Sequence, residues 1–326
     1  GYKSGCQFYN FIQKKLPLLH YAYFHFLEFA SIHHSPSKII GASKFSQKIE
    51  SFSPDLIVST HAHLNHGYFE LSRNSQRKLS RFVVYCGELA DGNGFSKHWI
   101  NPRNDLFISP FKEGSFAAQK RGMPLEKILV GGPLLREPFY GDHNNFNSSK
   151  VLTDYRLDPQ KPVFLLGTGA NGVNHHIPII KAISQTGIDC QILALCGRNE
   201  QTFHAINRLS LSNPRKIIPF RRLEANAMVD LLKVSTWMLA RPGAGLTTEA
   251  VVTGCPIIFD LSGGCMPQET NNLNFWKGRV GRLLTSSSPS QLIQHIQAGL
   301  DVPRLFIPME NSPNLLLRRL TELGER

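Results

Sequence analysis

Short apolar runs alternate with longer amphipathic segments along most of this chain. Between about residues 55 and 300 the short runs are rich in Val, Ile, Leu and Phe, and the segments between them carry apolar residues at helical spacing. This alternation is typical of parallel sheets with helical crossovers. We therefore expect strands at Leu56–Ser59, Phe82–Cys86, Leu106–Ser109, Ile128–Val130, Val163–Leu166, Gln191–Leu195, Lys216–Pro219, Trp237–Leu239, Pro256–Phe259 and Arg282–Leu284.

A polar stretch divides this pattern into two halves. Residues 141–149 read GDHNNFNSS, a turn-rich composition of the kind that links domains. A chain of 326 residues is long enough to bury two cores. The sequence thus predicts an α/β protein of two doubly wound Rossmann-like domains, residues 1–145 and 155–326, with a C-terminal helix over Ser312–Leu323.

The opening residues differ from those of a doubly wound unit. A strand and a glycine-rich turn normally come first, but here the chain reads GYKSGC and continues into aromatic, helix-like sequence. We expect the first domain to lack its initial strand and its glycine-rich loop.

The most informative segment runs from Thr236 to Asn272. Its first apolar run ends in the turn Gly243-Ala244-Gly245, and a helix carrying Glu249 follows. Glycines allow a close approach to an anion, and the first amides of a helix are unpaired donors at its positive end. Glu249 lies one to two turns into this helix, where it reaches the hydroxyls of a sugar attached to the phosphate. The segment predicts a nucleotide-sugar site.

Other polar turns follow strands of the same half. One is the sequence GTGANG, whose Gly167, Gly169 and Asn171 face a ligand in this interpretation; the others contain Arg198 and Phe220-Arg221. Glycine-rich turns occur in all α/β folds, so none is specific alone, and the acid that a dehydrogenase would need is misplaced at Asp189. Because ligands bind at the carboxyl ends of parallel strands, the turns together indicate a nucleoside-diphosphate site.

Histidines and carboxylates follow the strands of the first half. The loop after Ser59 contains His61, His63 and His66, which suits a metal cage, a role at the reaction cleft, or an ordinary polar loop. No Cys or acidic ligand accompanies them at a recognised spacing, so no metal site is expected. Glu88 and Asp91 lie in the loop after the next strand, and either carboxylate has the chemistry of a general base.

Charge and composition narrow the choice of partners. The net charge of +12 divides into +7 for residues 1–150 and +5 for the rest, which fits an anionic membrane surface, a nucleotide or nucleic acid. No helix-turn-helix or stacking motif accompanies it, so nucleic acid is not expected. The six cysteines show no CxxC spacing and read as free thiols in a reducing compartment.

The early apolar part of the chain, which includes the aromatic stretch Phe8–Phe29, bears on whether the protein spans or contacts a membrane. The most apolar early segment, Leu16–Ile32, is interrupted by His20, His25 and Glu28 and is too short to span a membrane. With its flanking lysines the aromatic stretch suits a membrane interface, and it suits a core helix equally. No signal peptide is expected, and the chain reads as a cytoplasmic, peripherally membrane-associated protein.

Several of these motifs together resemble one family. The segments SPDLIVSTH (53–61), CGRN (196–199), RPGAGLTTEA (241–250) and Gln268-Glu269 with Asn272 are similar to those of the monogalactosyldiacylglycerol synthase branch of the GT-B glycosyltransferases. That branch includes processive diacylglycerol glucosyltransferases and, more distantly, the peptidoglycan N-acetylglucosaminyltransferase. The resemblance implies a GT-B fold with two domains facing a cleft.

The resemblance also implies roles for individual residues. Gly243, Ala244 and Gly245 would hold the diphosphate, Glu249 the ribose, and Phe220 with the Arg221 backbone the uracil. Gln268 and Glu269 would hold the transferred sugar, and Asn272 belongs to the same donor-binding set. No cofactor and no metal are implied, since helix amides and Arg198 or Arg241 stabilise the leaving diphosphate. The family's acceptor-side glycine-rich loop has no counterpart, and its Thr-Asp pair is replaced by Gly87-Glu88.

The sequence therefore predicts a hexosyltransferase that moves sugar from a UDP-sugar to a membrane lipid, with diacylglycerol as the expected acceptor. His61, His63 and Glu88 are the candidates for the catalytic base. The alternative is a non-catalytic nucleotide-sugar-binding subunit or a partner subunit of such an enzyme.

Overall fold

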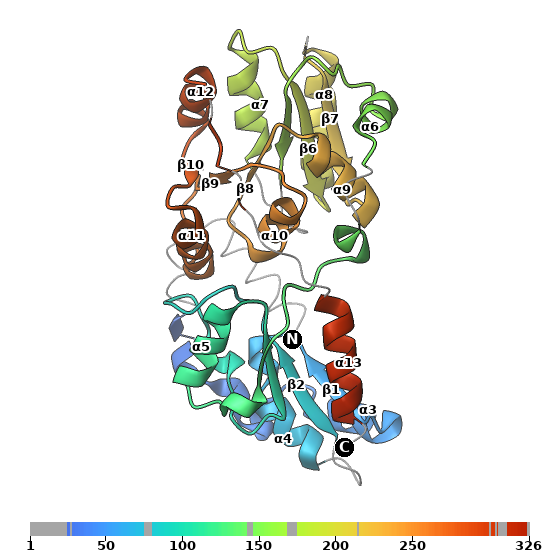
Figure 1. Cartoon of the computed structure of the whole chain (residues 1–326), viewed down its shortest axis with the longest axis vertical. Coiled ribbons are helices and arrows are strands. Elements are labelled where there is room, and N and C mark those ends of the chain that lie inside the picture. The colour runs from blue at the N-terminus through green and yellow to red at the C-terminus, as the bar shows by residue number, and fades with distance from the viewer. Residues whose placement is uncertain are drawn as a thin grey trace. The chain divides into compact units, whose positions relative to one another are not determined.

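The computed structural model describes residues 25–26, 28–74, 80–141, 146–167, 175–213, 215–299, 301–303, 305 and 312–324. The chain forms two compact units, each with its own parallel sheet (Figure 1). Unit 1 comprises Gly1–Leu134, Met266–Asn272 and Glu310–Arg326, and unit 2 comprises Leu135–Cys265 and Leu273–Met309. The expectation that the first domain lacks its opening strand falls on residues 1–24, outside the described part of the chain.

The sheet of unit 1 has four parallel strands in the order of the sequence. They are β1 (Leu56–Ser59), β2 (Arg81–Tyr85), β3 (Leu106–Ser109) and β4 (Ile128–Val130). Its described helical elements are η1 (Ile32–His34), η2 (Pro36–Lys38), α3 (Ala42–Phe52), η3 (Ala62–Leu64), α4 (Gly67–Asn74), η4 (Lys97–Trp99), α5 (Lys112–Lys120), η5 (Leu125–Lys127) and α13 (Ser312–Gly324).

Side chains of β2 alternate between two cores, as the period of a strand requires. Phe82 and Val84 pack on one face with Phe69 and Phe107. Val83 packs on the other face in a cluster that also contains Leu106, Ile108 and Leu316 of α13. The C-terminal helix is therefore part of the core of unit 1, although the sequence assigned it to the second domain (Figure 1).

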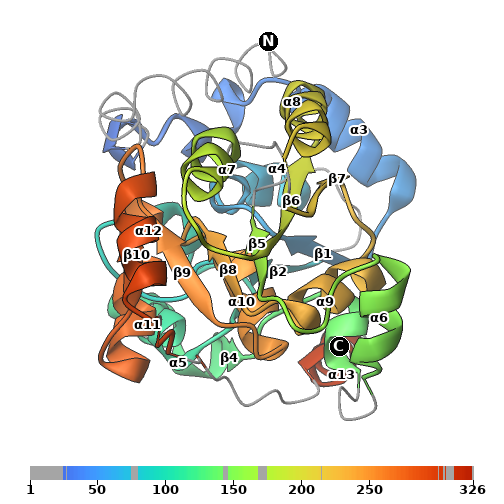
Figure 2. The ribbon, with the colours of Figure 1, turned by 90° about the horizontal axis from the view of Figure 1, so that it is seen from above.

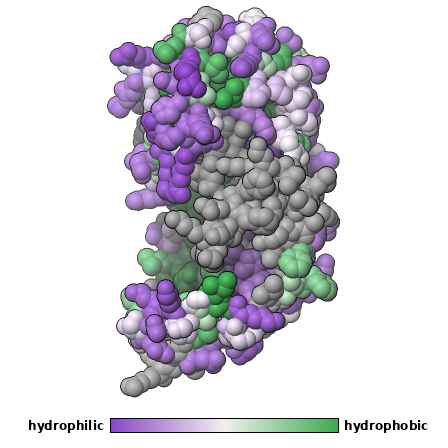
Figure 3. All heavy atoms as spheres, turned by 180° about the vertical axis from the view of Figure 1, so that it is seen from behind, coloured by the Kyte–Doolittle hydropathy of each residue, from purple (hydrophilic) through white to green (hydrophobic). Residues whose placement is uncertain are grey.

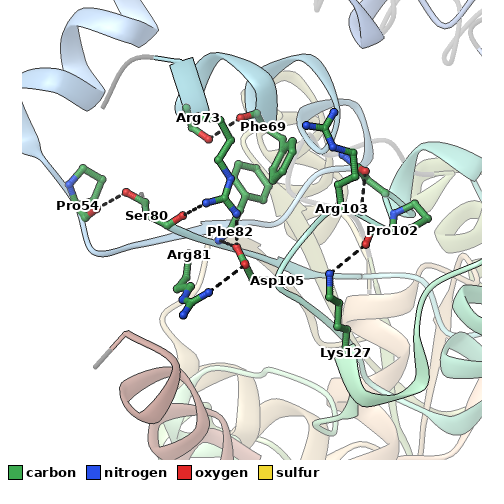
Figure 4. A network of polar contacts seen from close by, with 12 residues as sticks. Pro54, Phe69, Arg73, Ser80, Arg81, Phe82, Pro102, Arg103, Asp105 and Lys127 are labelled. Carbon is green, nitrogen blue, oxygen red and sulfur yellow. Dashed lines mark hydrogen bonds and ion pairs between the residues drawn. The ribbon is translucent and has the colours of Figure 1, made fainter. Parts of the chain in front are cut away.

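A carboxylate joins the edges of β2 and β3 to α4 (Figure 4). Asp105 Oδ2 accepts from Arg73 Nη2 and from the Phe82 amide, each at 2.7 Å, and Arg81 Nη1 lies 3.5 Å from Oδ1. Arg73 also donates to the Ser80 carbonyl at 2.9 Å, and its guanidinium lies 5.0 Å from the centre of the Phe69 ring. These contacts fix the start of β2 and hence the register of β1–β3.

The sheet of unit 2 has six parallel strands in the order β10-β9-β8-β5-β6-β7 (Figure 2). They are β5 (Val163–Leu166), β6 (Gln191–Gly197), β7 (Ile217–Arg221), β8 (Trp237–Ala240), β9 (Ile257–Asp260) and β10 (Leu284–Ser286). The helical elements around it are η6 (Glu137–Tyr140), α6 (Ser148–Asp154), α7 (His176–Ser184), α8 (Glu200–Leu211), α9 (Ala225–Val234), α10 (Ala244–Val252) and α12 (Pro289–Gln297).

The sequence predicted the strands of both sheets well. Every expected strand is present, with its ends shifted by at most two residues. The predicted α/β class with two parallel sheets is confirmed. The units differ from the expected continuous halves, because the start of α11 (Pro267–Val280) and the last helix both belong to unit 1.

One face of unit 2 is largely polar. On the face shown in Figure 3, hydrophilic residues make up most of the described surface of unit 2. Among the residues that the structure describes, no helix combines the length and the apolar character needed to cross a membrane.

Candidate functional site

The sheet of unit 2 changes direction between β5 and β8. From β5 the chain proceeds to β6 and β7 on one side, and it then returns to place β8 and β9 on the other. Such a switch point opens a crevice beyond the carboxyl ends of the two central strands. Two sequence-predicted turns follow these strands, the one at Gly167 after β5 and the one at Gly243 after β8.

The N-terminus of α10 presents free amides at this crevice. Gly243 is its N-cap, with extended backbone and no side-chain capping bond. The first intrahelical bond runs from the Thr247 amide to the Gly243 carbonyl at 3.2 Å, so the amides of Ala244, Gly245 and Leu246 precede it. Unpaired amides at the positive end of a nine-residue helix bind anions.

Gly167 allows the turn after β5 to pack closely against α10. Its amide donates to the Leu239 carbonyl at 2.8 Å. A Cβ at Gly167 would lie 2.9 Å from the Cβ of Ala240 and 3.0 Å from Cδ2 of Leu246, closer than side chains pack. The position therefore requires glycine for close packing of β5 on α10. Gly169 and Asn171, also predicted in this turn, lie outside the described residues.

Glu249 has a partner that the sequence did not reveal. Arg136 Nη2 and Nε lie 3.0 and 3.3 Å from Glu249 Oε1, and Nη1 donates to the Leu223 carbonyl at 3.3 Å. Burial raises the pKa of Glu249, and Arg136 opposes that shift. Both contacts with Arg136 are to Oε1, and within the described part of the chain Oε2 is left to accept hydrogen bonds from a ligand. Arg136 follows the Gly131-Gly132-Pro133 segment, which gave no hint of this pairing.

The other predicted donor residues of unit 2 lie at the same edge of the sheet. Arg198 is exposed just beyond β6. Phe220, near the end of β7, packs edge-to-face against Tyr155 with ring centres 5.5 Å apart. The side chain of Arg221 is engaged by Glu200, at 2.8 Å, and stacks over Phe203. Its backbone rather than its guanidinium is therefore available to a ligand.

Gln268, Glu269 and Asn272 belong to unit 1, not to the unit that carries the Gly243 turn. Glu269 is buried and accepts from the Met266 amide at 2.9 Å, which stabilises the start of α11. The buried Oε1 of Gln268 has no hydrogen-bond partner within the described part of the chain. These residues thus lie outside the unit to which the sequence assigned them, and their contact with the transferred sugar stays a prediction.

One polar cluster at the carboxyl end of β9 was not predicted from the sequence. Ser262 Oγ hydrogen-bonds to Nδ1 of His175 at 2.9 Å and donates to Asp260, whose Oδ2 lies 3.7 Å from the same ring nitrogen. Burial alone would raise the pKa of Asp260, but hydrogen bonds from His175 and Ser262 hold it below its usual value.

The candidate bases lie in unit 1. Burial raises the pKa of Glu88 to about 7, against a hydrogen bond from Trp99 that lowers it. His61 caps η3, since its Nδ1 accepts from the His63 amide at 3.3 Å. Nδ1 of His63 lies 3.1 Å from Nε2 of His33. A carboxyl group with a pKa near neutrality has the proton affinity that a general base needs.

The loop histidines are joined by others from distant segments. His33 and His34 of η1 and His98 of η4 lie against His63 and His66. We call His33, His34, His63, His66 and His98 the histidine cluster. The sequence gave no reason to combine these segments, which are separated by about 30 residues each.

Comparisons with known proteins agree with this architecture. Residues 2–134 match the family model of monogalactosyldiacylglycerol (MGDG) synthase. A processive diacylglycerol beta-glucosyltransferase of Bacillus licheniformis is 21% identical over 287 residues, covering 87% of this chain and 70% of the relative. The chloroplastic monogalactosyldiacylglycerol synthase 1 of Arabidopsis thaliana is 23% identical over 241 residues, covering 72% of this chain and 43% of the relative.

Solved structures share the fold. MurG of Acinetobacter baumannii matches with a TM-score of 0.50 and 14% identity, covering 89% of this chain and 73% of that one. The UDP-GlcNAc 2-epimerase of Methanocaldococcus jannaschii matches with a TM-score of 0.53 and 18% identity, covering 86% and 80%. The chain thus has the two-sheet architecture of GT-B glycosyltransferases and related epimerases. Its first 134 residues are similar to monogalactosyldiacylglycerol synthases, and most of its length is similar to processive diacylglycerol glucosyltransferases.

Proposed function

We propose that this protein is a glycosyltransferase that moves a hexose from a UDP-sugar to a membrane lipid, with diacylglycerol as acceptor. The observation that carries the proposal is the uncapped N-terminus of α10 at the switch point of unit 2, with Glu249 further along the same helix. The amides of Ala244–Leu246 suit a diphosphate, and Glu249 Oε2 suits vicinal hydroxyls of a ribose. The relatives named above support the sugar-to-diacylglycerol reaction.

The proposed reaction is a direct displacement at the anomeric carbon. The acceptor hydroxyl oxygen forms a bond to that carbon while the bond to the UDP oxygen breaks and UDP leaves with the electron pair. The amides of α10 stabilise the charge that develops on the diphosphate. The acceptor proton passes to a base of unit 1, for which Glu88, His61 and His63 are the candidates. Glu88 is the strongest of these because its pKa is about 7.

A lipid acceptor requires contact with a membrane, and unit 1 has apolar side chains available for it. Phe29 is 87% exposed and Ile40 is 77% exposed, and Lys38, Lys44 and Lys48 lie nearby in sequence. Exposed apolar groups beside lysines suit an anionic membrane surface. We therefore propose peripheral membrane association. Most of the aromatic stretch Phe8–Phe29 that first suggested it lies outside the described residues.

Calorimetry with UDP tests the donor site in the full 326-residue chain. Glu249→Gln should weaken UDP binding by about 1–3 kcal/mol, because it removes a charged hydrogen-bond acceptor. Binding of free uracil should be unchanged, and Glu137→Gln, at an exposed carboxylate of η6, should leave both affinities as they are. An equal loss with uracil, or binding of NAD without binding of UDP, would refute the donor assignment.

An assay of sugar transfer to diacylglycerol in vesicles separates the enzyme from a binding subunit. The enzyme transfers hexose from UDP-glucose or UDP-galactose, and Glu88→Gln lowers the rate while UDP still binds. A protein that binds UDP but transfers no sugar from either donor would instead be a nucleotide-sugar-binding subunit.

A further inference from the structure

The histidine cluster of unit 1 brings imidazoles from three segments into direct contact. The rings of His34 and His66 are stacked with centres 3.7 Å apart, and His34 Nε2 lies 2.7 Å from His98 Nδ1. His33 packs edge-to-face against both His63 and His98, with ring centres 4.2 Å apart in each case. Neither the reaction proposed above nor any hydrophobic core explains why so many nitrogen atoms converge.

His66 has a nitrogen aimed into this cluster without a partner. Its Nε2 is buried and forms no hydrogen bond to any part of the chain that the structure describes. The backbone at Ile100 and His98 interacts with the ring and favours its protonation. In the tautomer with the proton on Nδ1, the lone pair of Nε2 is left without a donor among the described residues. A buried acceptor without a donor costs free energy unless something binds there.

His98 is held by neighbours on its other side. It is fully buried, and its Nε2 lies 3.8 Å from Oε1 of Glu28. Glu28 is itself fixed, because it accepts from Ser96 Oγ at 2.5 Å and from the Lys97 amide at 3.0 Å. A carboxylate on the side of one ring nitrogen, with the opposite nitrogen toward the ligand set, is the arrangement found in metal-bound histidines.

The loop that carries His66 is anchored to the same place. Asn65 is fully buried and donates to the carbonyls of His98 and Trp99, each at 3.3 Å. Its side-chain oxygen accepts from Ser59 Oγ at 2.5 Å. Gly67 also brings η1 close, because a Cβ there would lie 2.6 Å from the His33 carbonyl oxygen. Packing and hydrogen bonds thus preset the positions of the three segments.

We propose that His34, His66 and His98 bind one divalent transition-metal ion of the zinc class. One nitrogen from each ring lies within 4.8 Å of the other two. Zinc with nitrogen ligands at 2.0–2.1 Å in tetrahedral geometry needs nitrogens about 3.3 Å apart, so shifts of about 1 Å close the site. The ion replaces the hydrogen bond between His34 and His98, and the shared proton moves to an outer ring nitrogen, which for His98 faces Glu28.

The donor set selects the class of ion. Three neutral imidazoles suit Zn²⁺, Co²⁺, Ni²⁺ or Cu²⁺, whereas Mg²⁺ and Ca²⁺ prefer oxygen ligands. Three protein ligands leave one position open for water or a further group. His33 and His63 form a second triad that shares His98 with the first, so the two triads compete for one ligand residue. One ion per chain is therefore expected.

Metal titration of the full chain without a histidine tag tests this site. After removal of metal with EDTA, calorimetry with ZnCl₂ should show one ion per chain with a dissociation constant below about 1 µM. Co²⁺ should give the visible absorption of a tetrahedral site, and excess Mg²⁺ should not displace it. His66→Ala should weaken zinc binding at least 100-fold, and His34→Ala should do the same if His66→Ala does not fold.

The matched control is His204→Ala, at an exposed histidine of α8 in unit 2, which should bind zinc as the wild type does. Circular dichroism verifies that each variant is folded. Zinc binding by folded His66→Ala and His34→Ala at wild-type affinity would overturn the proposal, as would a wild-type protein that binds no zinc. Loss of zinc in His63→Ala but not in His66→Ala would instead assign the ion to the other triad.

Discussion

Glu88 makes the stability of this protein depend on pH in a direction opposite to that of most carboxylates. Burial raises its folded-state pKa to about 7 from the ordinary value of 4.5. Between these values the folded protein holds a proton that the unfolded chain has released. The stabilisation is fully present below pH 4.5, and it is lost as the pH rises through 7.

The size of the effect follows from the shift. Each pKa unit corresponds to 1.36 kcal/mol, so the loss between pH 4.5 and pH 8 is about 3 kcal/mol. That is a large fraction of the 5–15 kcal/mol that stabilises a typical domain. Glu88→Gln replaces the carboxyl with a neutral amide of the same shape, so the variant does not incur the cost of ionising a buried group.

Urea unfolding at several pH values measures the difference in the free energy of unfolding between wild type and Glu88→Gln. The contributions of other titrating groups cancel in this difference. Relative to the wild type, the free energy of unfolding of the variant should rise by about 2.5 kcal/mol from pH 5 to pH 8. Glu126→Gln, at an exposed carboxylate of η5, is the control and should show no such gain. A difference between wild type and Glu88→Gln that stays constant over this range would refute a raised pKa at Glu88.

Three other substitutions or conditions test the remaining structure. Asp105→Ala should destabilise the protein by about 2–4 kcal/mol in thermal or urea unfolding, because it removes the carboxylate that pairs with the Arg73 guanidinium and leaves the Phe82 amide without its acceptor; an effect below 0.5 kcal/mol would contradict this. Gly94→Ala should destabilise by about 1–3 kcal/mol or more, since its Cβ would lie 2.3 Å from the Pro267 backbone; an unchanged melting temperature would show that this contact is absent. UDP binding should persist in excess EDTA, because amides rather than a cation hold the diphosphate; a requirement for Mg²⁺ or Mn²⁺ would count against the α10 site.

The sequence was sufficient to predict the strands and the glycine turn at α10. Apolar runs such as Trp237–Leu239 are buried because both faces of a parallel sheet are covered, and burial of this kind is readable from composition. The turn at Gly243 is equally local, since a strand, a turn and a helix follow one another along the chain. The GT-B fold was predicted from the resemblance of motifs such as residues 241–250 to those of one family.

The parts that escaped prediction depend on contacts between distant residues. The pairing of Arg136 with Glu249 spans 113 residues, and the contact of His34 with His98 spans 64. The periodicity of apolar residues along the sequence carries no information about contacts between such distant residues. The position of Leu316 in the core of unit 1 is similar, because its helical spacing predicted an amphipathic helix without naming the surface that it covers.

The location of α13 has a consequence for synthesis of the protein on the ribosome. The cluster that contains Val83, Leu106 and Ile108 is complete only when Leu316 is present. About 180 residues separate the end of β4 from Leu316, and at 5–20 residues per second their translation takes on the order of 10–40 s. During that time unit 1 exposes one apolar face of its sheet, while the sheet of unit 2 can already form. The first unit to be synthesised is thus the last to finish folding, and it is the part of the nascent chain for which a chaperone would matter most.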